Sequence, residues 1–326
     1  MRTTSLGSSQ IEVSAIALGT ATFGLSPAEG VVSELVAAAI DLGVNFFDTA
    51  NSYGNQPEYE WPGRPTAALR ASSEELLGDA LAGRADVVVA SKVGEPLGSD
   101  RAAAEWRGNL TRTYIIDQCA MSRRRLKRDC IDVYYAHLPD PTTPLLETVS
   151  AFNELIERGD IREWAISNFS PELTREVVGV ADAAGLRRPV ANQIAYNVAR
   201  RKEASDYGGT FAATGTSVVA YSPLEMGLLA GRGAAQRNWA GHARWGGSGF
   251  STSEIEVATR FEEAADELGR SPVDLAVAWL VHQPMVASVV SGATSIRHLS
   301  DAAQAAALSL SAEQVEKIEA VILPSR

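Results

Sequence analysis

The chain has 326 residues, of which 45% are hydrophobic and 21% charged, an ordinary composition for a folded protein. Its formal net charge of −11 predicts a surface that repels nucleic acid and anionic membranes, which excludes both as expected partners. The N-terminus lacks the apolar core of a signal peptide and no apolar run has the length of a membrane helix, so we expect a soluble, cytoplasmic protein.

Short apolar runs alternate with longer segments of helical periodicity along the chain. The predicted elements are, in chain order, a hairpin around 7–10, a strand at 15–19, a helix at 30–42, a strand at 44–48, a helix at 72–83, a strand at 86–92, a helix at 111–128, a strand at 130–137, a helix at 144–159, a strand at 161–168, a helix at 171–185, a strand at 189–196, a weakly helical stretch to 214, a strand at 216–223, a polar Gly-rich segment to 252, helices at 255–269 and 272–283, a strand at 286–292 and two final helical segments.

This repeated strand–helix order predicts parallel strands with helical crossovers. The strands are continuous apolar runs, as is typical of strands buried on both faces. No linker divides the chain, so we expect one domain over 1–326 in the α/β class, a (β/α)8 TIM barrel with an N-terminal β-hairpin and extra C-terminal helices. The alternative is an open doubly wound sheet, but GTATFG at 19–24 lacks its usual glycine fingerprint.

Two minor features complete the general description. A basic run, RRRLKR at 123–128, ends a predicted helix, where cations complement the helix dipole, and we interpret it as a solvated face. The two cysteines, Cys119 and Cys130, indicate a reducing compartment without a disulfide framework.

Polar side chains stand where the predicted strands end, the place where barrels of this kind collect functional residues. The second, third and fourth barrel strands end at Asp48, Lys92 and His137, and Tyr53 lies in the loop after the second. Each residue alone has a structural interpretation, such as a turn cap or a surface lysine. Together, on adjacent strands, they form a coherent set, which we interpret as catalytic.

The chemistry of this set is that of a proton donor. An unperturbed tyrosine has a pKa of about 10, too high for easy proton exchange at neutral pH. Lys92 can stabilise the Tyr53 phenolate, and Asp48 can hold Lys92 charged and in place. His137 can orient a substrate oxygen. A set that contains a proton donor and no nucleophile requires a hydride donor, which indicates a nicotinamide cofactor.

Seven segments from the second strand to the last resemble the aldo-keto reductase superfamily. They are FFDTANSYG, VVVASKVG, DVYYAHLPDP, WAISNFSP, VANQIAYN, VAYSPLEMGLLAG and VVSGATSIRHL, and SLGSSQIEVSAIALGT near the N-terminus also fits. HLPDPTTPLLETV resembles the branch that contains potassium-channel β subunits and bacterial sugar-type reductases. The resemblance implies reduction of an aldehyde or ketone, such as a keto-sugar or other secondary metabolite intermediate, by hydride transfer from NADPH with Tyr53 as general acid.

The resemblance also implies the roles of individual residues. The catalytic tetrad corresponds to Asp48, Tyr53, Lys92 and His137. The implied cofactor-binding residues are Ser167, Asn168 and Gln193 at the nicotinamide with Tyr221 stacked on its ring, then Ser222, Leu224, Gly227 and Leu229 along the pyrophosphate, and Gly292, Thr294, Ser295, His298 and Asp301 at the adenosine end. NADPH is the expected cofactor and NADH the alternative. No metal is expected.

Three departures from the family pattern stand out. Ser291 replaces a common proline, and Ala302 replaces an asparagine that usually contacts adenine. An insertion, NQPEYEWPGRPTAALRA at 55–71, follows the tyrosine loop, and we expect its Tyr59 and Trp61 to contact substrate, with a solvated loop as the alternative. The Gly-rich segment around Trp245 is the second expected substrate or lid element, with a disordered linker as the alternative.

Two other functions remain compatible with these residues. One is a nicotinamide-binding regulatory subunit with slow turnover, as in the channel branch. The other is a Schiff-base barrel enzyme with Lys92 as nucleophile.

Overall fold

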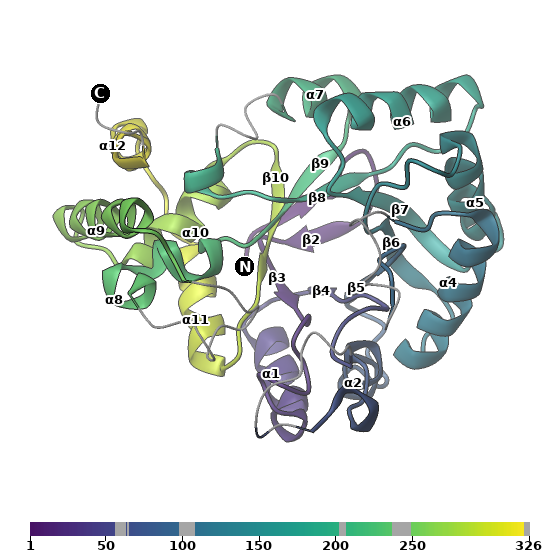
Figure 1. The fold of residues 1–326 in the computed structure, drawn as a ribbon, viewed down its shortest axis with the longest axis horizontal. Helices are drawn as coiled ribbons and strands as arrows, with labels where there is room; N and C mark the ends of the chain where they lie inside the picture. Colours follow the sequence, from purple (N-terminus) through teal and green to yellow (C-terminus); the bar gives the residue numbers. More distant parts are fainter. Residues whose placement is uncertain (56–62, 64, 98–107, 202–206, 237–248, 323–326) are drawn as a thin grey trace.

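The computed structural model describes residues 1–55, 63, 65–97, 108–201, 207–236 and 249–322. Eight parallel strands close into a barrel, and helices surround it on the outside (Figure 1). The strands follow one another around the barrel in the order β3 to β10, and β10 pairs with β3. This confirms the predicted (β/α)8 barrel and is incompatible with an open sheet.

The elements have the following bounds. The barrel strands are β3 (Ile16–Gly19), β4 (Phe46–Asp48), β5 (Val88–Val93), β6 (Ile131–Ala136), β7 (Ile161–Ser167), β8 (Ala191–Ala195), β9 (Ser217–Tyr221) and β10 (Val286–Ser291). The helices are α1 (Glu29–Asp41), η2 (Ala67–Leu69), α2 (Ser73–Ala80), α4 (Arg112–Leu126), α5 (Leu145–Glu157), α6 (Pro171–Ala183), η3 (Val198–Arg200), α7 (Tyr207–Thr214), η4 (Glu225–Ala230), α8 (Arg232–Ala235), α9 (Thr252–Glu267), α10 (Pro272–His282), α11 (Ile296–Ala305) and α12 (Ala312–Ile322).

Local sequence signals explain where the elements begin and how they pack. Ser72 caps α2, and Glu75 completes a reciprocal capping box with it, as the serine–glutamate pattern predicts. Every residue of β5 and β6 is buried, because one face of each strand meets the barrel interior and the other meets the helices. The apolar runs of the sequence therefore become the wall of the barrel.

A β-hairpin covers the amino-terminal end of the barrel. Its strands are β1 (Thr3–Ser5) and β2 (Glu12–Ser14), and its side chains Leu6, Ile11 and Val13 are buried in the cluster that fills the barrel interior. Gly7 has φ +58°, and a Cβ there would lie 2.1 Å from the carbonyl oxygen of Val190, so this turn requires glycine. The hairpin closes one end of the barrel and leaves the carboxyl end of the strands for a site.

The segment after β9 differs from the sequence prediction. The expected strand at 216–223 ends at Tyr221, because Ser222 adopts a left-handed conformation with φ 55°. Helical turns at 225–230 and 232–235 then occupy part of the segment that was predicted as irregular. The chain thus turns sharply at the carboxyl end of β9.

The basic run at 123–128 is only partly the solvated face predicted from its charge. Arg125 is half-buried, and its Nε lies 2.6 Å from Glu74, whose side chain is fully buried. Lys127 pairs with Asp79, and Arg123 pairs with Asp160 in the turn before β7. The run therefore joins α4 to its neighbours through ion pairs.

Helix length, metal-ligand grouping and cysteine pairing in the described residues bear on membrane spans, metal sites and disulfides respectively. None of the helices in these ranges combines the length and apolar character needed to cross a membrane. No group of three or more His, Cys, Asp or Glu side chains in the same ranges is arranged to hold a metal ion. Cys119 and Cys130 are free thiols.

Candidate active site

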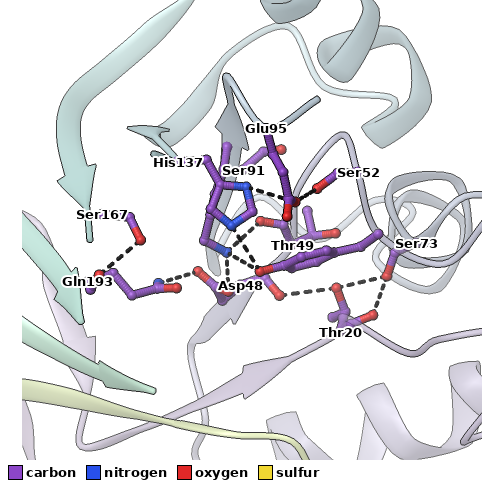
Figure 2. A network of polar contacts seen from close by, with 12 residues as sticks. Thr20, Asp48, Thr49, Ser52, Ser73, Ser91, Glu95, His137, Ser167 and Gln193 are labelled. Carbon is purple, nitrogen blue, oxygen red and sulfur yellow. Dashed lines mark hydrogen bonds and ion pairs between the residues drawn. The ribbon is translucent and has the colours of Figure 1, made fainter. Parts of the chain in front are cut away.

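The four predicted catalytic residues meet at the carboxyl end of three adjacent strands. Figure 2 shows Asp48 and His137 at this end of the barrel. Asp48 is the last residue of β4, Lys92 lies near the end of β5, and His137 follows β6 directly. Tyr53 belongs to the loop after β4. The parallel register brings these strand ends level, so residues that are far apart in sequence become neighbours in the barrel.

Lys92 is the centre of this group. Its side chain is fully buried, and its Nζ donates to Asp48 Oδ1 at 2.5 Å, to the carbonyl oxygen of Thr49 at 2.9 Å and to the Tyr53 hydroxyl at 3.3 Å. An ammonium group has three N–H donors, and here each has an acceptor. This arrangement fits a charged lysine and does not favour its use as a Schiff-base nucleophile.

Two opposing effects act on the charge of Lys92. Burial lowers the pKa of its ammonium group, while the adjacent Asp48 carboxylate raises it through charge and hydrogen bonding. The net effect lowers the pKa, while the hydrogen bonds of Nζ to Asp48, to the Thr49 carbonyl oxygen and to Tyr53 favour the charged form. A buried cation therefore stands beside the Tyr53 hydroxyl.

Tyr53 and His137 are in direct contact. The hydroxyl oxygen of Tyr53 lies 3.4 Å from Nε2 of His137, and the two rings meet edge to face with centroids 5.6 Å apart. Tyr53 is half-buried, whereas Asp48 and Lys92 are buried. Tyr53 is thus the residue whose hydroxyl contacts both Lys92 and His137 and which is itself partly exposed.

Asp48 has a second partner that the sequence did not indicate. Nε2 of Gln193, on β8, donates to Asp48 Oδ2 at 2.7 Å across the barrel interior (Figure 2). Gln193 was predicted from the family resemblance to hold a nicotinamide carboxamide, and that role remains a prediction. The contact with Asp48 shows that Gln193 also helps to fix the carboxylate that supports Lys92.

The strand end at Asp48 is braced from outside the barrel as well. The backbone N–H and the hydroxyl of Thr20 both donate to the carbonyl oxygen of Asp48, at 2.9 and 3.0 Å. Ser73, at the start of α2, donates in turn to Thr20. These bonds join the first two barrel strands to the helix after the tyrosine loop.

A buried acid beside His137 was also missed by the sequence reasoning. Oε2 of Glu95 lies 3.4 Å from His137 Nδ1 and accepts a hydrogen bond from Ser52 (Figure 2). Both Glu95 and Ser52 are buried. Their positions carry a signal in retrospect, since Ser52 adjoins Tyr53 and Glu95 comes three residues after Lys92, at the same end of the barrel.

The residues expected at the nicotinamide lie side by side on the next strand ends. Ser167 and Asn168 close β7, and Tyr221 closes β9. Asn168 Nδ2 donates to the carbonyl oxygen of His137 at 3.0 Å, and the Tyr221 hydroxyl donates to Asn168 Oδ1 at 2.8 Å. Burial raises the pKa of the Tyr221 hydroxyl, which therefore remains a neutral donor.

Left-handed backbone is concentrated at this rim. In the described ranges five non-glycine residues have positive φ, and four of them are Asn168, Ser222, Glu225 and Met226. Such conformations are costly and gather at ligand-binding sites, and successive N–H groups in left-handed turns form anion-binding concavities. The segment after β9, with Gly227 at φ 107°, thus has a backbone suited to a pyrophosphate.

Packing limits how individual residues of this segment can contact a ligand. Leu229 is fully buried in the cluster beneath the helices, and Leu224 is half-buried against the same cluster, so any ligand contact by Leu229 is through its backbone. Asn197 and Arg200 hold the Glu225 carboxylate, with Nε of Arg200 at 2.8 Å. These two side chains therefore fix the left-handed turn after β9 at Glu225.

The residues expected at the adenosine end lie after β10, at the start of α11. Ser295 caps α11 by accepting from the N–H of His298 at 3.2 Å, and Thr294 Oγ1 lies 3.3 Å from His298 Nδ1. Gly292 is exposed, and Asp301 lies 3.9 Å from Arg297, which is 88% exposed at its side chain. A guanidinium this exposed could reach the 2′-phosphate of a bound NADPH.

The residues predicted to contact substrate, Tyr59, Trp61 and Trp245, lie outside the residues that the structure describes.

Comparison with known proteins identifies the family. The family model described as "Aldo/keto reductase family" matches residues 15–323. The chain belongs to the aldo/keto reductase family. This agrees with the closed barrel and with the four side chains at its carboxyl end.

Relatives within the family carry two kinds of name. A probable voltage-gated potassium channel subunit beta from Oryza sativa subsp. japonica is 32% identical, over 99% of this chain and 97% of the relative. The uncharacterized oxidoreductase YqkF of Bacillus subtilis is 29% identical, over 98% and 96%. The uncharacterized oxidoreductase Mb2320 of Mycobacterium bovis is 31% identical, over 93% and 87%. Membership of this family, together with the relatives named as oxidoreductases, supports an oxidoreductase.

Proposed function

We propose that this protein reduces an aldehyde or ketone to an alcohol, with Tyr53 as the proton donor and a reduced nicotinamide as the hydride source. The observation that carries the proposal is the position of the Tyr53 hydroxyl, 3.3 Å from the buried Lys92 ammonium and 3.4 Å from His137. A cation beside a phenol favours the phenolate that remains when the proton has left. The group therefore lowers the barrier for donating a proton to a carbonyl oxygen.

A reduced nicotinamide held by Ser167, Asn168 and Tyr221 would supply the hydride that the carbonyl carbon needs. The Tyr53 O–H bond breaks as the new O–H bond of the alcohol forms. Lys92 stabilises the phenolate, and Asp48 keeps Lys92 in place through the 2.5 Å contact. Uptake of a proton from solvent restores Tyr53 for the next turnover.

NADPH is the proposed cofactor, with NADH as the alternative. The turn after β9 has the left-handed backbone that is typical of anion-binding sites and would lie along the pyrophosphate, and the row of Ser167, Asn168 and Tyr221 offers polar and flat groups for the nicotinamide. Near the start of α11, Arg297 and His298 are exposed basic side chains that can meet a 2′-phosphate. Comparison of Kd values for NADPH and NADH by fluorescence titration tests this preference, and a tighter Kd for NADH would reverse it.

Tyr53→Phe tests the acid assignment. The variant lacks only the hydroxyl, so it should bind NADPH as the parent does while turnover falls by about 10²- to 10⁴-fold, the usual contribution of a positioned acid. Tyr207→Phe is a matched control, because its hydroxyl donates to the carbonyl oxygen of Phe169 away from the tetrad. Full reductase activity in Tyr53→Phe would overturn the assignment.

A second candidate function follows from the channel-subunit relatives, namely a nicotinamide-binding regulatory subunit with slow turnover. Asp48, Tyr53, Lys92 and His137 are all present and in contact, which favours the enzyme. Steady turnover of a carbonyl substrate by the isolated chain discriminates between the two.

A further inference from the structure

Each basic side chain beside the Tyr53 hydroxyl is backed by a buried carboxylate. Lys92 pairs with Asp48, and His137 has its Nδ1 3.4 Å from Oε2 of Glu95. The Tyr53 oxygen lies between the two pairs, 3.3 Å from Nζ of Lys92 and 3.4 Å from Nε2 of His137. The first pair belongs to the expected tetrad, whereas Glu95 has no role assigned to it.

Glu95 is held at the Nδ1 side of the imidazole. It comes two residues after β5, and its side chain is only 6% exposed. Ser52, which is fully buried in the loop after β4, donates a hydrogen bond to the same Oε2. Burial lowers the pKa of Lys92, and Glu95 joins Asp48 in opposing that shift, so its charge acts within the site.

The carboxylate restricts the protonation states of His137. A neutral imidazole has a single N–H, and the negative charge of Glu95 on the Nδ1 side favours the N–H there, although the 3.4 Å contact is not itself a hydrogen bond. Nε2 is then an acceptor. Nε2 would then draw the Tyr53 proton to itself and away from a substrate. An imidazolium has N–H on both sides, so Nε2 donates to the Tyr53 oxygen and the hydroxyl proton stays free for the carbonyl.

We infer that Glu95 is a positioning residue, which keeps His137 as the imidazolium at working pH and thereby directs the Tyr53 proton toward the substrate. A carboxylate about 4 Å or less from an imidazole favours its charged form. A distance of 3.4 Å suits an ion pair and exceeds that of a strong hydrogen bond, and contacts of this kind often shorten when a ligand is bound.

The other groups that face His137 act on it less directly. In the described ranges Tyr53 contacts the imidazole, and Lys92, paired with Asp48, lies on the other side of the Tyr53 hydroxyl. The Lys92 charge is balanced by Asp48, so among the acidic side chains that the structure describes Glu95 is the one in contact with the imidazole itself. The protonation of His137 is a property of the free protein, and its catalytic meaning rests on the proposed function.

The first test reads protonation without turnover. The chain has four histidines, so the ring nitrogens of ¹⁵N-histidine-labelled protein can be assigned by NMR with the variant His137→Gln. We expect His137 to be doubly protonated at pH 7 in the parent, and to lose its proton about one pH unit lower or more in Glu95→Gln. A neutral His137 at pH 7 in the parent, or an unchanged titration in the variant, would overturn the inference.

The second test reads the same effect in catalysis. For carbonyl reduction, the alkaline limb of the kcat profile should move to lower pH in Glu95→Gln, with about a tenfold loss near pH 8 and a smaller loss near pH 6. Glu95→Asp, which keeps the charge, should restore most of the limb. A pH-independent loss would indicate a merely structural role and would also contradict the inference.

A matched control separates local from general effects. Glu163→Gln removes another buried carboxylate, at the amino-terminal part of β7, where it pairs with Arg187. It should leave both the His137 titration and the pH profile unchanged. The NMR titration tests the effect of Glu95 on His137 even if the protein reduces no carbonyl. Failure of the proposed function can therefore be distinguished from failure of this inference.

Discussion

Replacing Lys92 with methionine separates the structural role of the buried ion pair from its chemical role. The side chains of Lys92 and Asp48 are 0% and 3% exposed, so solvent screens neither. Removing one partner of such a pair leaves an unpaired buried charge and costs about 3–5 kcal/mol. For 326 residues the unfolding entropy is about 0.7 kcal/mol/K, so the melting temperature should fall by about 4–7 °C.

The double variant Lys92→Met/Asp48→Asn completes the cycle. It has no unpaired charge, and the amide oxygen of the asparagine introduced at position 48 can still accept from Gln193, so we expect it to recover about 2 kcal/mol or more of the loss. Both variants should lose about 10²- to 10⁴-fold in kcat for carbonyl reduction, because Tyr53 has lost its cation.

Two measurements check this cycle. Thermal unfolding followed by circular dichroism gives the stabilities, and oxidation of NADPH in the presence of an aldehyde gives kcat. A double variant as unstable as Lys92→Met would show that the loss is due to packing and not to charge. Reductase activity near the parental level in Lys92→Met would refute the role given to the ammonium group.

Two further predictions concern the frame of the barrel and the loop beside His137. Gly7→Ala should destabilise the fold by about 2–4 kcal/mol in urea unfolding without changing kcat, since a Cβ would lie 2.1 Å from the Val190 carbonyl oxygen at the far end of the barrel. Gly30 in α1 has open space around it, so Gly30→Ala should stabilise the fold by about 0.5–1 kcal/mol. Equal effects of the two substitutions would contradict this reasoning. Partial burial raises the pKa of Asp140, but hydrogen bonds from the surrounding backbone and hydroxyl groups outweigh this effect and lower the pKa below 3.8. The carboxylate therefore stabilises the fold fully above its unfolded-state pKa, and this stabilisation is lost as pH falls through the lower pKa of the folded state. Asp140→Asn should cost stability at pH 7 and little near pH 3, and a cost that does not depend on pH would refute this prediction.

Strand ends were the part of the site that sequence alone could predict well. A parallel barrel brings the carboxyl ends of its strands level, so Asp48, Lys92 and His137 could be placed together from their positions after apolar runs. The alternation of strands and helices likewise predicted the closed fold, because each apolar run needs cover on both faces.

The contacts across the barrel could not be predicted in the same way. Gln193 meets Asp48 although 145 positions separate them, and that pairing depends on the curvature of the closed sheet. Glu95 and Ser52 stand close in sequence to Lys92 and Tyr53, but they lie in turns whose backbone directions are set by packing. Spacing alone therefore places them at this end of the barrel and does not predict that Ser52 holds Glu95 beside His137. The left-handed turn at Ser222 was also missed, since serine has no strong preference for it and was assigned to a strand.

Both oxygens of Asp48 are committed, one to Lys92 and the other to Gln193. An engineer who wished to change the proposed nicotinamide contact of Gln193 by redesigning β8 would therefore disturb Asp48 on β4 and Lys92 on β5 at the same time. Substitutions at Gln193 that remove its amide N–H leave a buried carboxylate oxygen without its donor, and compensating changes at Asp48 would reach Lys92. Evolution of the two halves of this rim is accordingly expected to be coupled, and library designs should vary them together.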